Sequence, residues 1–333
     1  MDIQAIKERV LTSPAFVVDE TEVIKSLKTL SSLRESSGCK VLYSIKALSL
    51  SAILELAKPY IDGFSVSSLF EARLADEILA GQGSIHLTTP GIRQDEIAGL
   101  ASLCSHISCN SLSQFQQVAN VAKSKESIGL RINPKLSFTE DNRHDPCRQY
   151  SKLGVDINGM LPPDVFKHIK GLHFHTVYSA MDYASLMQTL DKLRHLMGDS
   201  FAQFDWLNLG GGYLFDQIED NRSFIELVKQ LKKEFDLEVF IEPGNAVVGK
   251  AGYLLTTVID SFDSDCKAVA ILDTSVNHHP QVFEYQRQPE LAEHDEDGNY
   301  PVILAGSTCL AGDIFGEYCF NQPIMVGDKL VFK

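Results

Sequence analysis

The sequence contains no apolar run long enough to cross a membrane, which needs roughly 20 consecutive apolar residues. Its first segment mixes charges of both signs, so no secretory signal peptide is predicted. The seven cysteines are scattered and include no C-x-x-C pair. That spacing favours neither a zinc site nor a disulfide framework, and it predicts no metal and a reducing, cytoplasmic compartment.

Positive charge is also scarce. Thirty Lys and Arg residues face 44 Asp and Glu residues, which gives a formal net charge of −14 and a pI of about 5.1. Binding to nucleic acid or anionic lipid needs a basic surface, so neither partner is predicted. The hydrophobic content of 44% is ordinary for a soluble globular protein, and 333 residues suffice for a barrel with a second domain.

Short apolar runs alternate with stretches of helical period from about Phe16 to Gly252. The candidate strands are KVLYSIKA (40–47), GFSV (63–66), SIHLTT (84–89), HISCN (106–110), SIGLRIN (127–133), GLHFHTVY (171–178), WLNLGGG (206–212) and EVFIEPG (238–244). A strand–helix unit that recurs about eight times predicts an α/β fold, a (β/α)8 barrel over residues 16–252.

The pattern changes after Gly252. YLLTTVIDSF, KAVAILDTS, YPVILAG and KLVFK are rich in β-forming residues and have no helical stretch between them. We therefore predict a second, all-β domain from residues 253–333 together with residues 1–15. The polar segment 286–300 is expected to be a surface loop. Because the sequence stops at Lys333 inside an apparent strand, we expect the native chain to continue.

Chemically useful residues cluster where such barrels place their active sites, at the C-terminal ends of the strands. They are Lys46, Ser65, Arg131, His175, Gly210, Gly211, Gly212 and Glu242. Taken singly, each has a plain structural explanation, such as a lysine that extends from an apolar strand to solvent or a glycine-rich turn. Their common position in the barrel predicts one active site.

The order of the motifs resembles the fold-type III decarboxylases that depend on pyridoxal 5′-phosphate. These motifs are S-I-K-A, R-I-N-P, H-F-H, G-G-G, E-P-G and T-C-L-A-G-D, spread over about residues 14–333. That group includes ornithine, diaminopimelate and carboxynorspermidine decarboxylases. GLHFHT, EPGNA and TCLAGDIFGEY most resemble the carboxynorspermidine/carboxyspermidine subfamily. The resemblance implies a barrel of the alanine-racemase type and a small-molecule α-amino-acid substrate.

The resemblance also implies roles for the barrel residues. Lys46 would hold the cofactor as a Schiff base, His175 would stack on the cofactor ring, and Glu242 would pair with the ring nitrogen. Glycine backbones would approach the phosphate, where a Cβ would interfere. The implied cofactor-binding set is Lys46, Arg131, His175, Gly210, Gly211, Gly212, Glu242 and Gly244.

Cys309 resembles the cysteine that these enzymes place in the neighbouring subunit's active site. It would protonate the carbanion left after loss of CO2, which makes Lys46, His175 and Cys309 the implied catalytic residues. A shared site implies a homodimer. Asp313 matches an acid that contacts the distal amine of the substrate. The implied substrate-binding residues are Asn245, His278, Gln281, Asp313 and Tyr178.

Three departures from the subfamily pattern bear on the substrate. Asn245 stands where a second glutamate usually follows E-P-G, and Gln281 stands where HHPQVFE would carry an aspartate. After His175, TVYSA replaces T-L-C-E. Charge-assisted hydrogen bonds are roughly twice as strong as neutral ones, so these changes predict an aminocarboxypropyl-bearing substrate less cationic than carboxyspermidine. Family members also continue past this point with a tyrosine that contacts the cofactor phosphate.

Two other functions remain open. An amino-acid racemase on the same fold would need a tyrosine acid–base partner in the β region, whereas the cysteine of TCLAGD favours decarboxylation. A non-catalytic homologue that binds pyridoxal phosphate is the second alternative. Small carriers of this kind lack the β region, and a pseudoenzyme would be expected to lose catalytic groups that are all present here. An assay that measures CO2 release and racemisation of the substrate distinguishes the two enzymatic hypotheses.

Overall fold

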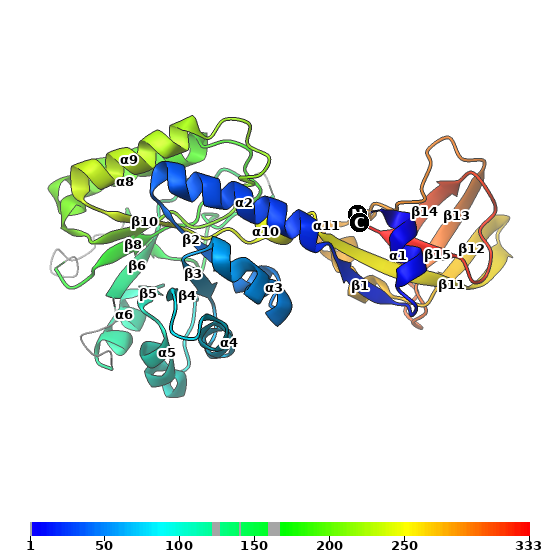
Figure 1. The fold of residues 1–333 in the computed structure, drawn as a ribbon, viewed down its shortest axis with the longest axis horizontal. Helices are drawn as coiled ribbons and strands as arrows, with labels where there is room; N and C mark the ends of the chain where they lie inside the picture. The colour runs from blue at the N-terminus through cyan, green and yellow to red at the C-terminus, as the bar shows by residue number, and fades with distance from the viewer. Residues whose placement is uncertain (1, 122–126, 140, 159–166) are drawn as a thin grey trace. The chain divides into compact units, whose positions relative to one another are not determined.

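The computed structural model describes residues 2–121, 127–139, 141–158 and 167–333 (Figure 1). The chain divides into two compact units. We call Val23–Gly249 the barrel unit, and Met1–Glu22 together with Lys250–Lys333 the sheet unit. No helix among the described residues is long and apolar enough to span a membrane.

Eight of the described parallel strands form a closed ring in the barrel unit. They are β2 (Lys40–Ser44), β3 (Gly63–Val66), β4 (Ser84–Thr88), β5 (His106–Cys109), β6 (Ser127–Asn133), β8 (Gly171–His173), β9 (Trp206–Asn208) and β10 (Glu238–Ile241). The pairing order is β5-β4-β3-β2-β10-β9-β8-β6, and pairing of β5 with β6 closes the ring. The short β7 (Val155–Asp156) pairs with β6 outside it. The predicted (β/α)8 barrel is confirmed.

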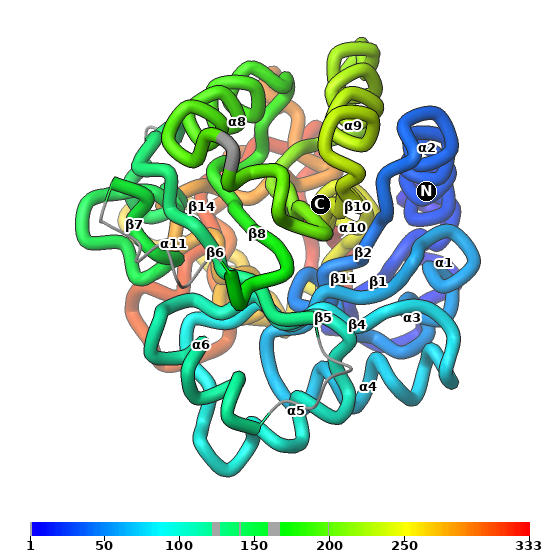
Figure 2. Tube along the Cα trace, turned by 90° about the vertical axis from the view of Figure 1, so that its left-hand side faces the viewer, coloured from blue at the N-terminus to red at the C-terminus, as the bar shows by residue number. Residues whose placement is uncertain are grey.

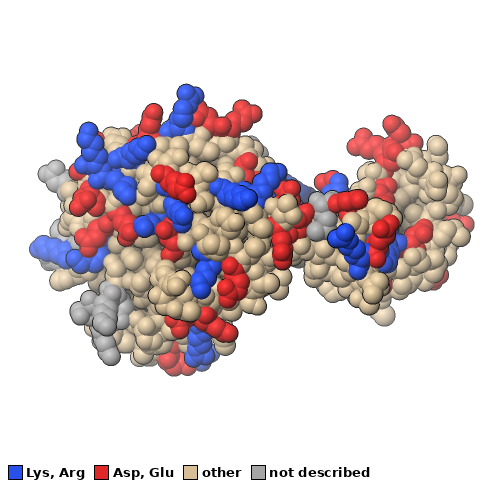
Figure 3. All heavy atoms as spheres, viewed as in Figure 1, with Lys and Arg blue, Asp and Glu red and all other residues tan. Residues whose placement is uncertain are grey.

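Helices surround the ring, as Figure 2 shows. They are α2 (Glu20–Ser37), α3 (Ser51–Ala57), α4 (Leu69–Leu79), α5 (Ile97–Leu103), α6 (Leu112–Ala119), α8 (Ala184–Met197) and α9 (Arg222–Phe235). The long helix α9 buries an apolar stripe, because its buried residues Phe224, Leu227, Val228 and Leu231 follow helical spacing. On the face of the barrel unit drawn in Figure 3, acidic and basic side chains are interspersed, so that face carries no extended basic patch.

Aromatic rings fill the barrel interior. His86 and His106 stack with ring centroids 4.0 Å apart, and both contact Phe240. Trp206 meets His106 edge-on at 5.5 Å. A Cβ added to Gly171 would lie 2.0 Å from the Trp206 ring, which explains the glycine in that strand. This packed layer supports the strand ends that carry the site.

The sheet unit is built from six described strands. They are β1 (Ala15–Val18), β11 (Gly252–Ser264), β12 (Lys267–Leu272), β13 (Tyr300–Ala305), β14 (Ile314–Phe320) and β15 (Lys329–Phe332). The order is β1-β11-β12-β13-β14, with β15 paired to β11. Alternate residues face a core in which Phe315 and Phe332 stack with centroids 4.6 Å apart.

The predicted second β domain is confirmed, but two details of this region differ from the prediction. Short helices occur where none was predicted: α1 (Ile3–Arg9), η5 (Val276–His278) and α11 (Gln281–Tyr285). They are too short for apolar periodicity to indicate them. Segment 286–300 is not wholly a surface loop, because Leu291 is buried in the core and forms an isolated bridge with Phe332.

Candidate active site

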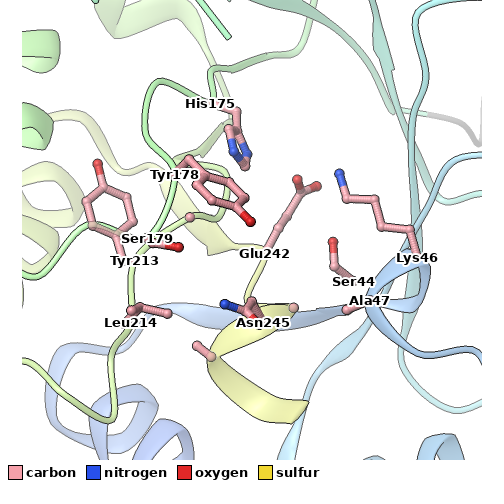
Figure 4. Close-up of a pocket in the computed structure, with 13 residues that line it drawn as sticks. Ser44, Lys46, Ala47, His175, Tyr178, Ser179, Tyr213, Leu214, Glu242 and Asn245 are labelled. Carbon is pink, nitrogen blue, oxygen red and sulfur yellow. The ribbon is translucent and has the colours of Figure 1, made fainter. Parts of the chain in front are cut away.

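A cavity of about 270 Å³ opens in the barrel unit, near the lower end of the roughly 300–1,000 Å³ usual for small-molecule sites. Figure 4 shows the side chains of Lys46, Glu242 and His175 converging on it. Its lining residues are Ser44, Lys46, Ala47, His175, Tyr178, Ser179, Gly212, Tyr213, Leu214, Glu242, Gly244, Asn245 and Ala246. They follow β2, β8, β9 and β10, or end them, so the cavity lies at the C-terminal ends of these strands.

Lys46 lies in the 3-10 turn η1 (Ile45–Ala47), directly after β2. The buried Ile45 anchors the turn, and the Tyr43 hydroxyl donates to the Leu48 carbonyl at 3.1 Å. The Ser44 amide donates to the Pro243 carbonyl at 2.9 Å, which ties this turn to the E-P-G segment. The Lys46 side chain is exposed and extends into the cavity toward Glu242 (Figure 4).

Glu242 is a buried carboxylate with two polar neighbours in the barrel wall. One oxygen, Oε1, accepts a hydrogen bond from Asn208 Nδ2 at 2.9 Å, and Oε2 lies 3.4 Å from His173 Nε2. Burial alone would raise the pKa of Glu242, but His173, the Lys46 charge and the Asn208 hydrogen bond lower it overall. Glu242 is therefore an anion at neutral pH.

His173 does not act as a cation in this pair. Burial lowers its pKa, although Glu242 opposes that shift. The 3.4 Å contact with Glu242 is long for a hydrogen bond, and neither ring nitrogen has a hydrogen-bond partner among the described residues. The Glu242 anion is therefore stabilised by the adjacent His173 ring, then by the ammonium of Lys46 and by the hydrogen bond from the Asn208 amide.

His175 follows β8 in a loop and carries a neutral ring. Burial, and then the charges of Arg131 and Lys46, hold its pKa well below the usual value. Its Nδ1 accepts a hydrogen bond from the Gly211 amide at 3.2 Å, so the ring proton is on Nε2. A neutral, flat ring at the cavity wall can stack on an aromatic ligand without adding a positive charge.

The glycines after β9 are required by close packing of the backbone. A Cβ on Gly210 would lie 2.4 Å from the Phe174 carbonyl, and one on Gly212 would lie 2.2 Å from the Val177 carbonyl. Both residues have positive φ, +70° and +91°. The Gly210 amide donates to Asn208 Oδ1 at 2.9 Å and the Gly211 amide to His175 Nδ1 at 3.2 Å. Of the three, only Gly212 lines the cavity.

Two further residues implied by the resemblance line the cavity, Tyr178 from the loop after β8 and Asn245 from a short helix. Tyr178 is 47% exposed and stacks on His144, with ring centroids 4.6 Å apart and an interplanar angle of 16°. Asn245, the first residue of α10 (Asn245–Val248), is exposed. Arg131 and Ser65 are buried at strand ends but do not line the cavity. Burial lowers the pKa of Arg131, while Glu242 opposes that shift.

Sequence reasoning assigned no role to His173, Asn208 or Tyr213. His173 and Asn208 are register partners on β8 and β9, so they reach Glu242 from adjacent strands. The sequence contains their motifs, H-F-H and L-N-L-G-G-G, but it does not show the strand pairing that brings them to Glu242. Tyr213 lines the cavity, yet its hydroxyl points away from Lys46 in Figure 4.

The remaining implied residues belong to the sheet unit. Cys309 is exposed in the loop between β13 and β14. His278 is exposed and its Nδ1 lies 2.8 Å from Thr274 Oγ1, and Gln281 is exposed at the start of α11. Asp313 has an unexpected environment, because it is 2% exposed and accepts hydrogen bonds from the chain itself. Among the described residues, no group of three or more potential ligands could hold a metal ion.

Comparison with known proteins adds a family and its members. The family described as "Pyridoxal-dependent decarboxylase, C-terminal sheet domain" matches residues 15–333. A carboxynorspermidine/carboxyspermidine decarboxylase from Campylobacter jejuni is 33% identical over 97% of this chain and 87% of that protein. A carboxyaminopropylagmatine decarboxylase from Synechocystis is 34% identical over 97% of this chain and 84% of that protein.

Solved structures agree with these matches. The crystal structure of carboxynorspermidine decarboxylase from Campylobacter jejuni, complexed with norspermidine, superposes with a TM-score of 0.86 at 32% identity, covering 97% of this chain and 88% of that one. Diaminopimelate decarboxylase from Helicobacter pylori, complexed with L-lysine, gives a TM-score of 0.82 at 19% identity over 99% of this chain and 88% of that one. The second likeness shows the fold alone.

Proposed function

The chain belongs to the pyridoxal-dependent decarboxylases, and on that premise we propose that it decarboxylates an aminocarboxypropyl-bearing amino acid less cationic than carboxyspermidine. Decarboxylation with pyridoxal phosphate as cofactor is the activity of the family. Its relatives named above act on carboxynorspermidine, carboxyspermidine or carboxyaminopropylagmatine, according to their names. The choice among such substrates is the part that we propose.

The cavity residues fit the cofactor. An amine on Lys46 faces a buried carboxylate, Glu242, that stays anionic and can pair with a protonated ring nitrogen. When bound, pyridoxal phosphate accepts the electron pair that loss of CO2 leaves on the substrate. We propose that Lys46, His175 and Glu242 hold the ring, with Arg131 nearby, and that Gly212 and Gly244, which line the cavity, form the phosphate side. The amides of Gly210 and Gly211 support this wall through their hydrogen bonds to Asn208 and His175.

Each residue then has a defined task. The Lys46 amine would hold the cofactor. The Glu242 anion would stabilise positive charge on the ring nitrogen, and the neutral His175 would cover a ring face without adding a competing cation. Cys309 of a second subunit delivers the proton: its S–H bond breaks as a C–H bond forms at the former α-carbon, and water later restores the thiol proton.

The charge of the cavity wall carries the substrate proposal. Glu242 is the single carboxylate among the described lining residues, and the cofactor would use it. Tyr178 and Asn245, which stand at positions implied to bind substrate, are neutral and accessible. A distal ammonium would find no anionic partner in this wall, whereas a neutral polar end could hydrogen-bond to Asn245.

A substrate panel tests this proposal. CO2 release would be measured with carboxyspermidine, carboxynorspermidine, carboxyaminopropylagmatine and the N-acetyl derivative of carboxyspermidine, which lacks the distal charge. We expect kcat/KM for the acetylated compound to equal or exceed that for carboxyspermidine. Strong preference for carboxyspermidine would reject the proposed substrate class. Lys46→Ala is the control and should abolish both turnover and the visible absorbance of the bound cofactor.

We also propose a cytoplasmic homodimer in which each active site receives Cys309 from the other subunit. The exposure of Cys309 on a sheet-unit loop supports such a role, and all seven cysteines are free thiols, as a reducing compartment maintains. Mixing Lys46→Ala and Cys309→Ala subunits tests the shared site. Random pairing should restore about a quarter of wild-type activity, because half of the dimers carry one intact site. An inactive mixture that exchanges subunits would contradict sharing.

A further inference from the structure

The loop that carries Cys309 is held at both sides of that residue. It leaves β13 at Ala305 and enters β14 at Ile314, and residues 307–312 are exposed. The Ser307 amide donates to the Thr274 carbonyl at 3.0 Å, and the Asp313 amide donates to the Leu310 carbonyl at 2.9 Å. An exposed loop with fixed ends presents its middle residue, the Cys309 thiol, outward.

The carboxylate of Asp313 lies beneath this loop and accepts four hydrogen bonds. Oδ2 accepts from the Thr308 amide at 3.1 Å and from the Thr308 hydroxyl at 2.5 Å. Oδ1 accepts from the Val276 amide at 2.8 Å and from the Ser275 hydroxyl at 3.2 Å. Four donors match the roughly four lone-pair sites of a carboxylate, so no acceptor site remains for a substrate amine.

The carboxylate also fixes how closely the backbone can pack. A Cβ on Gly306 would lie 2.4 Å from both carboxylate oxygens, so only glycine fits at the start of the loop. Burial raises the pKa of Asp313, but the hydrogen bonds from Thr308, Val276 and Ser275 lower it overall. The anion is therefore the state that the surrounding donors select.

We propose that Asp313 is a positioning residue: its buried carboxylate locks the Cys309 loop onto the η5 segment and so aims the thiol at the α-carbon of the substrate. This inference rests on the proposed role of Cys309 as proton donor. Thr308, the residue before Cys309, is held by its amide and its hydroxyl. The hydrogen bonds continue into the 274–278 segment, where Thr274 Oγ1 lies 2.8 Å from His278 Nδ1. Asp313 thereby couples the Cys309 loop to the segment that carries His278.

The experiment compares Asp313→Asn with wild type in the holoenzyme. An asparagine offers one acceptor oxygen and turns an NH2 group toward donors, so the loop loses its lock. We expect kcat to fall about 10- to 100-fold, less than the roughly 10²–10⁴-fold that a positioned acid contributes. The KM should change less than about twofold, because substrate binding is not altered.

A stereochemical readout separates positioning from simple destabilisation. In D2O, one acid acting from one face places deuterium in a single configuration at the former α-carbon. Asp313→Asn should give mixed configurations, because solvent competes with a misplaced thiol. Glu293→Gln is the matched control: Glu293 accepts a hydrogen bond from the Val331 amide and pairs with Lys7 in the same unit, outside the Cys309 loop and the 274–278 segment. It should lower the Tm but keep kcat and a single configuration.

Thr308→Val keeps the inference testable if Asp313→Asn does not fold. It removes one of the four donors, so kcat should fall about three- to tenfold, in line with the loss of one hydrogen bond. Wild-type kcat and a single configuration in both variants, with only the Tm lowered, would overturn the positioning role. A Cys309→Ala enzyme with unchanged kcat and configuration would instead overturn the proton donor of the proposed function.

Discussion

Two buried carboxylates, one in each unit, are held in opposite ways. Glu242 in the barrel unit accepts one well-formed hydrogen bond, from Asn208, and faces a cavity and a lysine. Asp313 in the sheet unit accepts four hydrogen bonds from neutral donors and is closed off. The pKa of each is lowered overall, yet by different neighbours. A carboxylate with unused acceptor sites can bind a ligand, whereas a carboxylate whose acceptor sites are all filled by the chain stabilises the local fold.

Of the substitutions that test this comparison of the two carboxylates, Glu242→Gln is expected to have the largest effect on kcat. Removing a preorganised charge partner from an active site typically costs roughly 10²–10³-fold in kcat, and Glu242 is the anion proposed to face the ring nitrogen. Because the pKa of Glu242 is lowered overall, its anion also stabilises the fold at neutral pH, so this change should lower the Tm as well as kcat. Steady-state CO2 release with saturating cofactor, together with a melting curve, measures both effects.

Glu317→Gln is the control for Glu242→Gln. Glu317 pairs with Lys267 on an exposed part of the sheet unit at 2.5 Å, so its loss should change neither quantity. A Glu242→Gln enzyme that lost Tm but kept kcat would reverse the comparison, because that is the pattern of a structural carboxylate.

Acid should destabilise the barrel unit before it affects Asp313. Burial lowers the pKa of His106 from 6.5 to about 4, and burial with the neighbouring His106 holds that of His86 well below normal. Unfolded histidines gain protons below about pH 6.5, so folding stability is lost from there down to about pH 4, by roughly 3 kcal/mol for His106 alone. The anion of Asp313 contributes stability that is lost only below about pH 4, as its lowered pKa is approached.

Trp206 makes this difference measurable. It is the single tryptophan, and its ring lies 5.5 Å from that of His106. Its fluorescence should report barrel unfolding at a higher pH than the circular dichroism of the sheet unit changes. His106→Phe keeps the stacked aromatic layer and should flatten the stability curve between pH 6.5 and 4. An unchanged slope in that variant would contradict the assignment.

The sequence was sufficient for the barrel because its strands are apolar runs of clear length separated by amphipathic stretches. Lys46 and Glu242 could be chosen because strand ends meet at one rim of a barrel, whatever the details. The contacts of Asn208 and His173 with Glu242 could not be predicted from the sequence, since they depend on register between neighbouring strands. Register follows from hydrogen bonding across the sheet, which a one-dimensional pattern does not contain.

Asp313 illustrates a second limit. The motif TCLAGD marked an acid near Cys309, and the resemblance implied that it binds substrate. Whether its side chain turns outward or inward depends on where the Val276 and Thr308 amides lie, and these come from separate segments. The short helices α1 and α11 were missed for a simpler reason, since seven and five residues hold too few turns to show a period.

The smallest predicted effect comes from a substitution that adds a second carboxylate facing the cavity. Asn245 is exposed beside the cavity, so Asn245→Glu would place a second anion there, with water still competing for it. Exposed ion pairs are worth roughly 0.2–1 kcal/mol, which corresponds to at most about a fivefold change. We therefore expect kcat/KM for carboxyspermidine, relative to its N-acetyl derivative, to rise about two- to fivefold, and the gain to shrink in high salt because screening weakens exposed pairs. Asn245→Gln, which has the length without the charge, should show no shift. An equal response of both substrates to Asn245→Glu would mean that the distal end of the substrate does not reach this wall, and Glu242 would then be the only anion of the cavity that matters for either compound.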